Sequence, residues 1–175
     1  MSEETPARKP TLYILSAPSG GGKSSLARAL VERAQDTVTS VSHTTRPQRT
    51  GETHGVDYFF VHQSEFEQMI KDDGFLEYAR VFDHWYGTSR KVVEQAIVQN
   101  RSIMLDIDWQ GAQQVRRAFP AAVSVYILPP SVEALAQRLV DRGRDSPDEI
   151  TSRLSEAASE MSHYDEYDHI LININ

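Results

Sequence analysis

Residues 15–30, LSAPSGGGKSSLARAL, place three consecutive glycines, a lysine and two serines between an apolar run and the start of a helical pattern. The stretch nearly matches G-x-x-x-x-G-K-[ST], a loop whose backbone N–H groups surround nucleotide phosphates, but Ala17 occupies the position of the first glycine. Alanine is disfavoured there only if φ must be positive, at a cost of about 1–2 kcal/mol. We therefore predict that φ at Ala17 is negative and that the loop binds phosphate.

The order strand, loop, helix gives the polar groups of this loop specific roles. Backbone N–H groups and the positive end of the following helix attract anions, and Lys23 adds a point charge for the terminal phosphates. The Ser24 hydroxyl is a candidate magnesium ligand. A flexible glycine turn without a ligand is the alternative, and the flanking elements argue against it. The residues expected to bind the triphosphate are Ala17, Pro18, Ser19, Gly20, Gly21, Gly22, Lys23, Ser24 and Ser25.

Four continuous apolar runs predict strands buried on both faces of a parallel sheet, at residues 11–16, 102–107, 123–128 and 169–174. Between them, apolar residues recur at helical spacing. This alternation predicts an α/β fold in which a parallel sheet is flanked by helices.

Residues 40–88 interrupt the alternation, with short β-like pieces around one helix. That helix is expected to begin at Ser64 with a capping box to Glu67. We predict an inserted, mixed α/β subdomain over residues 40–88 and a core formed by residues 11–39 and 89–175.

A second irregular segment, DRGRDSPDE, separates two helical patterns near the C-terminus. Ser146, Pro147 and Glu149 predict an N-cap, a first-turn proline and a capping box for the second of these helices. We predict a hinged helical lid over residues 138–153. Residues 1–10 are expected to form a disordered tail.

Composition restricts the partners and the compartment. The chain has 175 residues, of which 39% are hydrophobic, which suffices for one domain with a sizeable core. A net charge of −7 argues against non-specific nucleic-acid binding, and the absence of cysteine excludes thiolate metal sites. No apolar run approaches the roughly 20 residues of a membrane span, and the N-terminus does not read as a signal peptide. We expect a cytoplasmic protein without nucleic-acid or membrane partners, and the oligomeric state stays open.

A cluster of phosphate-binding side chains is predicted in the inserted segment. Arg46 and Arg49 lie three residues apart in a Pro- and Gly-containing stretch, where two guanidinium groups can converge on one phosphate. Tyr58 and Tyr86 can add hydroxyl donors. Taken singly, each residue also fits an ordinary surface arginine or a packed tyrosine.

Three carboxylates are candidates for reading a base or holding a metal. Glu77 has apolar neighbours, so we expect it to be partly buried and to need a partner such as guanine, which presents N1–H and an exocyclic amine side by side. Asp106 and Asp108 end an apolar strand and are predicted to point to the same side, at the sheet edge where α/β proteins bind ligands. The alternative for this pair is a cap on Trp109 and the following turn.

These residues lie in motifs that resemble the guanylate kinase family, and its bacterial members in particular. The motifs follow one another over about residues 11–173: SAPSGGGKSSL, SVSHTTRPQRTGE, HGVDYFFV, FLEYARVF, WYGTS, MLDIDWQGAQQ, ILPPS and EMSHYDEYDHILIN. The resemblance implies a P-loop NTPase fold and transfer of the ATP γ-phosphoryl group to GMP or dGMP with Mg²⁺, as part of purine nucleotide metabolism. It also treats Ala17 as an accepted variant.

The resemblance implies a role for each matching position. Guanine is read by Ser42, Glu77, Thr88 and Asp108, and the GMP phosphate is held by Arg46, Arg49, Tyr58 and Tyr86. Asp106 lies beside the GMP site, the metal and its waters, and Asn173 lies on the adenine side. Lid arginines Arg138, Arg142 and Arg153 close on the ATP phosphates. Catalytic charge neutralisation falls to Lys23, Arg46, Arg142 and Arg153.

Three departures from the family pattern bear on these expectations. Pro47 follows the first arginine, whereas the family has proline just before the second. Asp83, His84 and Trp85 replace a Gly-Asn-Tyr stretch in the turn expected to carry Tyr86. The family also continues past Asn175 into C-terminal helices, so the sequence is expected to be a truncated member.

Two other functions are alternatives to GMP phosphorylation. One is a catalytically inactive guanylate-kinase-like module that binds peptides, but such modules typically lose the lysine loop that this chain keeps. The other is a P-loop kinase for a different small acceptor, which Glu77 with two arginines and two tyrosines argues against.

Overall fold

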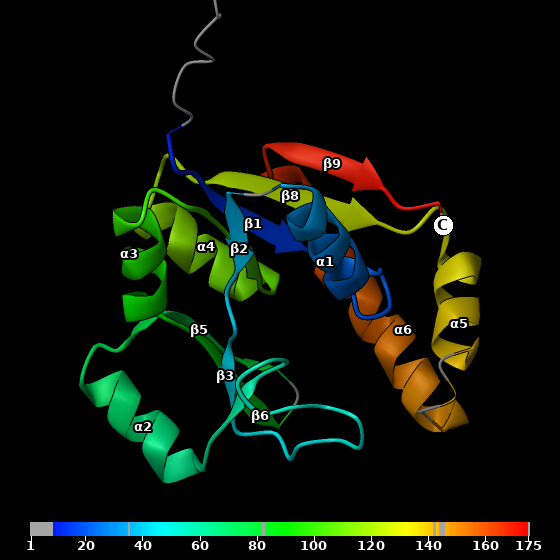
Figure 1. Ribbon diagram of the computed structural model, residues 1–175. Helices are drawn as coiled ribbons and strands as arrows, with labels where there is room; N and C mark the ends of the chain where they lie inside the picture. The colour runs from blue at the N-terminus through cyan, green and yellow to red at the C-terminus, as the bar shows by residue number, and fades with distance from the viewer. Residues whose placement is uncertain (1–8, 35, 82, 142, 144–145, 175) are drawn as a thin grey trace, which may run out of the picture.

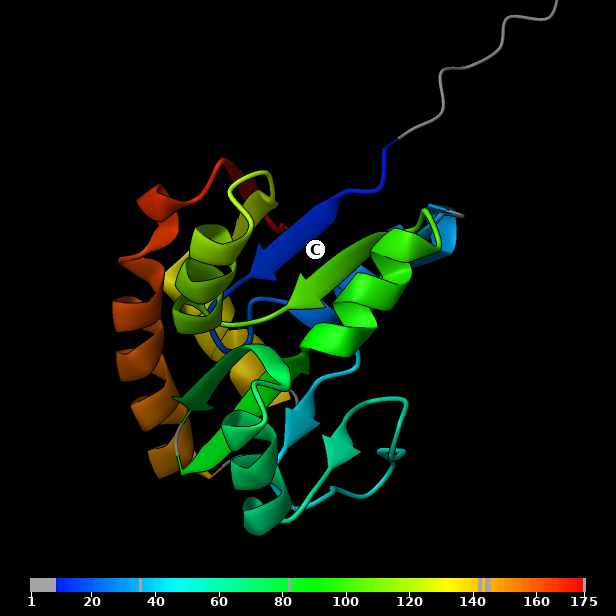
Figure 2. The ribbon, with the colours of Figure 1, turned by 90° about the vertical axis from the view of Figure 1, so that its left-hand side faces the viewer.

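The computed structural model describes residues 9–34, 36–81, 83–141, 143 and 146–174 (Figure 1). Most of the predicted tail, residues 1–8, lies outside this part of the chain. Two sheets are present, a larger parallel one and a smaller mixed one, and both Figures 1 and 2 show the smaller sheet beside the larger, on the side away from β9 (His169–Ile172).

The larger sheet confirms the predicted α/β class. Its order is β2-β7-β1-β8-β9 and every neighbouring pair is parallel. The four predicted runs form β1 (Leu12–Ser16), β7 (Ser102–Asp106), β8 (Val123–Leu128) and β9. The remaining strand, β2 (Thr37–Thr39), was not predicted, because a three-residue, partly exposed TVT carries little hydrophobic signal.

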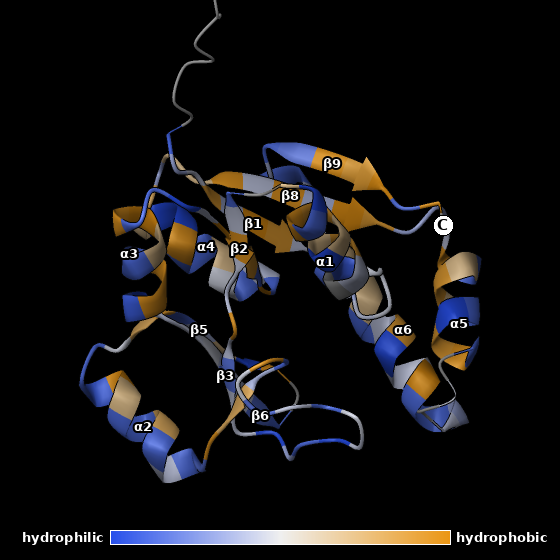
Figure 3. Cartoon of the chain, in the orientation of Figure 1, coloured by the Kyte–Doolittle hydropathy of each residue, from blue (hydrophilic) through white to orange (hydrophobic). Residues whose placement is uncertain are grey.

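Helices pack on both faces of this sheet. Helix α1 (Lys23–Arg33) covers one face, and α3 (Arg90–Val98) and α4 (Trp109–Ala118) cover the other. Helix α5 (Val132–Asp141) packs on α6 (Pro147–Met161). In Figure 3 the central strand β1 and most of β8 are coloured as apolar, whereas the helices carry both hydrophilic and hydrophobic residues. Within the described residues, no helix combines the length and hydropathy needed to cross a bilayer.

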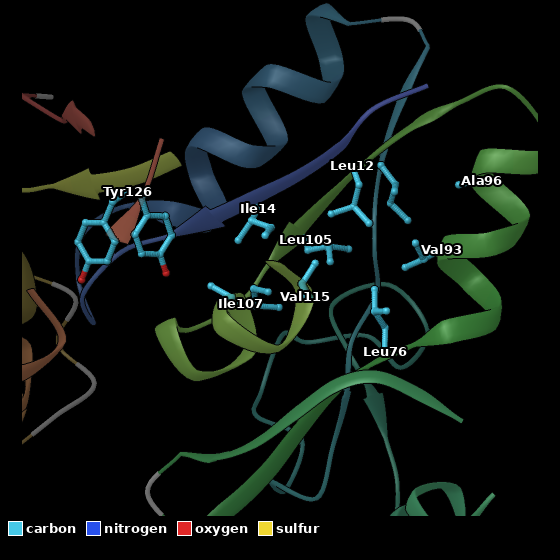
Figure 4. Close-up of a cluster of buried hydrophobic side chains, with 12 residues drawn as sticks. Leu12, Ile14, Leu76, Val93, Ala96, Leu105, Ile107, Val115 and Tyr126 are labelled. Atoms are coloured by element: carbon cyan, nitrogen blue, oxygen red, sulfur yellow. The ribbon is translucent and has the colours of Figure 1, made fainter. Parts of the chain in front are cut away.

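Side chains of the central strands point alternately to the two faces of the sheet and pack into two separate hydrophobic clusters. Leu12 and Ile14 of β1 join the cluster that α3 and α4 cover, drawn in Figure 4, whereas Leu15 packs with Ala27 of α1 on the opposite face. Leu76, from the smaller sheet, also belongs to the cluster in Figure 4. One strand of the smaller sheet is therefore anchored in the main core.

The smaller sheet has the order β4-β3-β6-β5, with β3 (His43–Thr44), β4 (Phe59–Phe60), β5 (Phe75–Val81) and β6 (His84–Ser89). Helix α2 (Gln63–Lys71) closes it, and its fully buried Phe66 stacks on Phe75 with ring centroids 4.4 Å apart. Tyr86 lies within β6, so the expectation that it sits in a turn was wrong.

The two predicted capping boxes have opposite outcomes. Ser146 caps α6 with the expected reciprocal bonds to Glu149 and with proline in the first turn. The box at Ser64 was wrong, because α2 begins one residue earlier and extended His62 takes the cap position without a side-chain bond. Glu67 instead accepts a hydrogen bond from the Gln63 amide at 2.8 Å.

Candidate functional site

The glycine-rich loop connects β1 to α1 at the carboxyl edge of the larger sheet. Gly20 and Gly22 have φ of 91° and 88°, a region that glycine enters without strain, and Ala17 is not among the residues with positive φ, as predicted. At Gly20 a Cβ would also meet Leu135 Cδ1 at 2.8 Å. Glycine is required at position 20 by both conformation and space, and position 17 has no such requirement.

The side chain of Lys23, the first residue of α1 after this loop, is held by two polar contacts. Its Nζ donates to the Ile107 carbonyl at 3.1 Å and pairs with Asp106 Oδ1 at 2.9 Å. Burial acts to lower the pKa of Lys23, but the charge and hydrogen bond of Asp106 outweigh burial, so this pKa lies above its usual range. The ammonium group therefore stays charged at every physiological pH.

Helix α6 makes two hydrogen bonds to the loop at Ser19. The Ser19 N–H donates to Glu160 Oε2 at 3.0 Å, and Arg153 Nη1 donates to the Ser19 hydroxyl at 3.1 Å. The buried Tyr126 hydroxyl of β8 donates to the Glu160 carbonyl at 2.9 Å, which fixes this end of α6 on the sheet. Glu160 was not among the predicted site residues. The signal was its spacing of seven residues from Arg153, which puts both on one helix face.

A cavity of about 550 Å³ adjoins the loop. Asn173 closes one side, where its Nδ2 donates to the Gly21 carbonyl at 3.0 Å, and Arg138 Nη2 donates to the Asn173 carbonyl at 2.8 Å. The structure thus brings these two predicted residues together beside the loop. The Ser24 side chain and Arg142 lie outside the described part of the chain. The cavity is lined by Gly20, Gly22, Ser25, Leu26, Ala29, Arg138, Asp141 and Asn173.

Arg46 lies in a cluster with Tyr58 and Tyr86, the two tyrosines that were predicted to bind phosphate. Its guanidinium carbon lies 5.5 Å from the Tyr58 ring centre, and the Tyr58 and Tyr86 rings are 5.9 Å apart. Its Nη2 bonds Glu52 Oε1 at 2.8 Å, and the other carboxylate oxygen of Glu52 accepts the Arg49 backbone N–H. The Arg49 side chain is exposed. Glu52, which sequence analysis did not single out, organises this turn.

Glu77 is the most unusual acid of the site. It is only 4% exposed and faces fully buried Thr88 across the β5–β6 pair. Burial raises the pKa of Glu77 to about 7, against the opposing influence of Thr88. Ser42, the residue directly before β3, is also buried. An acid in this state gains strongly from a ligand that supplies hydrogen-bond donors.

Asp106 and Asp108 take different local roles. Asp106 pairs with Lys23, whereas Asp108 caps α4, with Oδ1 accepting the Gly111 N–H at 2.8 Å and Oδ2 accepting from the Gln110 amide at 3.1 Å. Asp108 therefore acts as a helix cap, which is the alternative role that the sequence left open for it. Because an ionised carboxylate offers about four acceptor positions, the cap leaves room for a further donor.

Lys23 links the two halves of the site electrostatically. Burial raises the pKa of Tyr58, and the charges of Asp106 and Lys23 also act on it. Burial is likewise the dominant influence on the pKa of Glu77, on which the charge of Lys23 also acts. The Lys23 ammonium group is therefore in the electrostatic neighbourhood of both Tyr58 and Glu77.

Comparisons with known proteins agree on one family. The family model described as guanylate kinase matches residues 9–175. The guanylate kinase of Methylococcus capsulatus is 58% identical over 162 residues, covering 93% of this chain and 79% of that protein. That of Chromohalobacter salexigens is 55% identical over 168 residues, covering 96% and 78%.

A solved structure extends the agreement to three dimensions. The crystal structure of guanylate kinase from Anaplasma phagocytophilum matches with a TM-score of 0.79 at 36% identity, covering 95% of this chain and 78% of the other. The loop–helix geometry, the parallel sheet and the sequence matches point the same way. This chain belongs to the guanylate kinase family.

Proposed function

We propose that this chain transfers the γ-phosphoryl group of ATP to GMP, and to dGMP, giving ADP and the nucleoside diphosphate. The observation that carries the proposal is a buried carboxyl group, Glu77, in the same electrostatic neighbourhood as the phosphate-loop lysine, Lys23. The names of the relatives, all guanylate kinases, support the same reaction. Purine nucleotide metabolism in the cytoplasm is the setting that we infer for it.

Guanine recognition is assigned to Glu77, with Ser42, Thr88 and Asp108 around it. Burial makes ionised Glu77 costly in the free protein, and guanine offers two adjacent N–H donors that stabilise the ionised form. Adenine lacks that pair of donors. The GMP phosphate is assigned to Arg46, Arg49, Tyr58 and Tyr86, of which Arg46 and the tyrosines already lie together.

The ATP side is assigned to the loop of residues 17–25, with adenosine in the adjoining cavity beside Arg138 and Asn173. Magnesium fits the residues present, because Mg²⁺ binds one or two carboxylates together with substrate phosphates and Asp106 keeps a partly exposed carboxylate next to Lys23. Asp106 and the Ser24 hydroxyl would hold the ion. Bound there, it would neutralise phosphate charge.

Catalysis then needs alignment more than side-chain chemistry. The GMP phosphate is already a nucleophile, so no general base is required, and Lys23, Arg46, Arg142 and Arg153 are proposed to neutralise the developing charge. We further propose that the inserted subdomain of residues 40–88 and a lid of residues 138–153 close over the substrates and exclude water. The contact of Arg153 with Ser19 supports a lid that reaches the loop.

A coupled assay for ADP with GMP, dGMP, AMP and IMP as acceptors tests this function. GMP and dGMP are expected to give the highest kcat/KM. A preference for AMP would overturn the guanine assignment. Binding of GMP without turnover, in the presence of ATP and Mg²⁺, would favour the non-catalytic module instead.

A further inference from the structure

One glutamine side chain acts as a strand partner for β5. The Tyr78 N–H donates to Gln114 Oε1 at 3.2 Å, and Gln114 Nε2 donates to the Tyr78 carbonyl at 2.7 Å. Because β5 is the edge strand of the smaller sheet, its outward backbone groups have no strand on that side. The two-pronged amide of Gln114 satisfies both groups of one residue and fixes β5 to α4.

The residue held in this way is the direct neighbour of Glu77. One turn before Gln114 on α4 stands Gly111, and a Cβ at Gly111 would collide with the Glu77 carboxylate. The Glu77 side chain therefore lies against α4 at a position where only glycine leaves room. Gln114 and Gly111 together determine how closely the acid approaches the helix.

The same end of α4 holds the second acid assigned to guanine. Asp108 caps the helix through the Gly111 N–H, and the Gln114 amide also bonds the Gln110 carbonyl at 3.4 Å. The spacing between Glu77 and Asp108 thus depends on the register between β5 and α4. A side-chain amide is the direct polar link that sets this register at Tyr78.

We propose that Gln114 is a positioning residue for guanine recognition, which fixes β5 on α4 so that Glu77 meets the base at hydrogen-bond distance. This inference rests on the proposed function. It predicts that loss of the Gln114 amide lowers selectivity for the 2-amino group of the purine, and not only overall activity, because a misplacement of about 1 Å weakens directional contacts strongly.

The chain offers a matched control in the next residue. Gln113 is also a glutamine of α4, but its amide donates to Glu166 Oε2 at 2.9 Å, toward the segment after α6. Replacement of either residue by methionine keeps the side-chain length and removes the hydrogen bonds. Only Gln114→Met removes a bond to β5.

The test compares kcat/KM for GMP and for IMP, which lacks the 2-amino group, in the wild type, Gln114→Met and Gln113→Met. We expect the GMP/IMP ratio to fall about tenfold in Gln114→Met, with KM for ATP unchanged, and to stay within about twofold of wild type in Gln113→Met. An equal loss for GMP and IMP would show a purely structural bond and overturn the inference.

A second variant keeps the test valid if Gln114→Met fails to fold. Gly111→Ala, on the same helix α4, crowds the Glu77 carboxylate directly while adding a better helix former, so the helix itself is favoured. The GMP/IMP ratio should fall here too, and an unchanged ratio would contradict the inference. A wild-type ratio near one would instead reject guanine reading itself, and with it the proposed function.

Discussion

The glycine-rich loop and the proposed acceptor site are built in different ways. The loop comes from nine consecutive residues, and its shape rests on backbone conformation, with positive φ at Gly20 and Gly22. The proposed acceptor site takes Glu77 from β5, Tyr86 and Thr88 from β6, and Asp108 from the N-cap of α4, so its groups are side chains that distant elements bring together. Local geometry makes an anion site recognisable in sequence, whereas base selectivity depends on tertiary register.

The two regions also differ in how they hold charge. Lys23 is paired with Asp106, so the loop is electrostatically satisfied without a ligand. Glu77 is buried beside uncharged Thr88 with its pKa raised by burial to about 7. The proposed acceptor site thus contains a carboxyl group, Glu77, whose ionised form is unfavourable in the free protein. Four substitutions test this difference between the loop and the proposed acceptor site.

The largest effect is expected at Lys23. Lys23→Ala should lower kcat by about 10³-fold, since one positioned donor to developing charge contributes 10²–10³. The GMP dissociation constant, measured by calorimetry, should change by less than about threefold, because the charge acts on the ATP side. The control is Arg28→Ala, an exposed cation of the same helix. A collapse of GMP affinity in Lys23→Ala would show that the two regions are one site.

Glu77→Gln should weaken GMP by about 2–3 kcal/mol, because a charged acceptor becomes an amide with a mismatched donor. The same change should stabilise the free protein. A carboxyl whose folded pKa is near 7, above its unfolded value of about 4.3, makes the free energy of unfolding fall by about 4 kcal/mol as pH rises through that window.

Urea unfolding at pH 5 and pH 8 measures this stability term. The wild type should lose stability relative to Glu77→Gln between these two pH values, and Glu67→Gln, at an exposed position of α2, should follow the wild type. Parallel pH profiles for wild type and Glu77→Gln would mean that Glu77 is not an energetic cost in the free protein.

Glu160→Ala should raise KM for ATP about tenfold, because the loop loses a charge-assisted bond to the Ser19 N–H worth about 1.5 kcal/mol or more. KM for GMP should stay unchanged. The control is Glu156→Ala, one turn earlier on α6, whose carboxylate accepts from the Ser152 hydroxyl. Similar KM shifts for both nucleotides would place Glu160 in general stability and not in the loop.

The smallest effect is expected at the first loop position. Ala17→Gly restores the usual motif, but φ at Ala17 is not positive, so glycine brings no relief of strain. Stability should fall by about 0.4–1 kcal/mol from the greater freedom of the unfolded chain, with KM for ATP unchanged. A thermal melt together with an ATP titration measures both, and tighter ATP binding would show hidden strain.

Much of the fold could be predicted because its signals are local. The strands Ser102–Asp106 and Val123–Leu128 are built around continuous apolar runs, as is typical of strands covered on both faces, and the Ser146 capping box is a four-residue pattern. Strand β6 escaped prediction because HWYGTS mixes aromatic and polar residues with glycine, and its pairing with β3 and β5 is a tertiary contact.

The sequence predicted the candidate site residues themselves, but not the residues that hold them in place. Lys23, Arg46 and Glu77 stand out by chemistry alone, but their partnership with other groups depends on the fold. Glu52, Glu160 and Gln114 read as ordinary surface residues in sequence, since nothing local shows that their side chains reach Arg46, Ser19 and Tyr78.

The bond between Glu52 and Arg46 has a consequence for how an acceptor arrives. Glu52 already neutralises Arg46, the cation proposed to bind the acceptor phosphate, so binding of that phosphate would exchange one counter-ion for another. A phosphate monoanion carries the same charge as the Glu52 carboxylate, whereas a phosphate dianion attracts Arg46 more strongly than Glu52 does. Nucleotide capture should therefore weaken as acidity rises past the second phosphate ionisation, near pH 6.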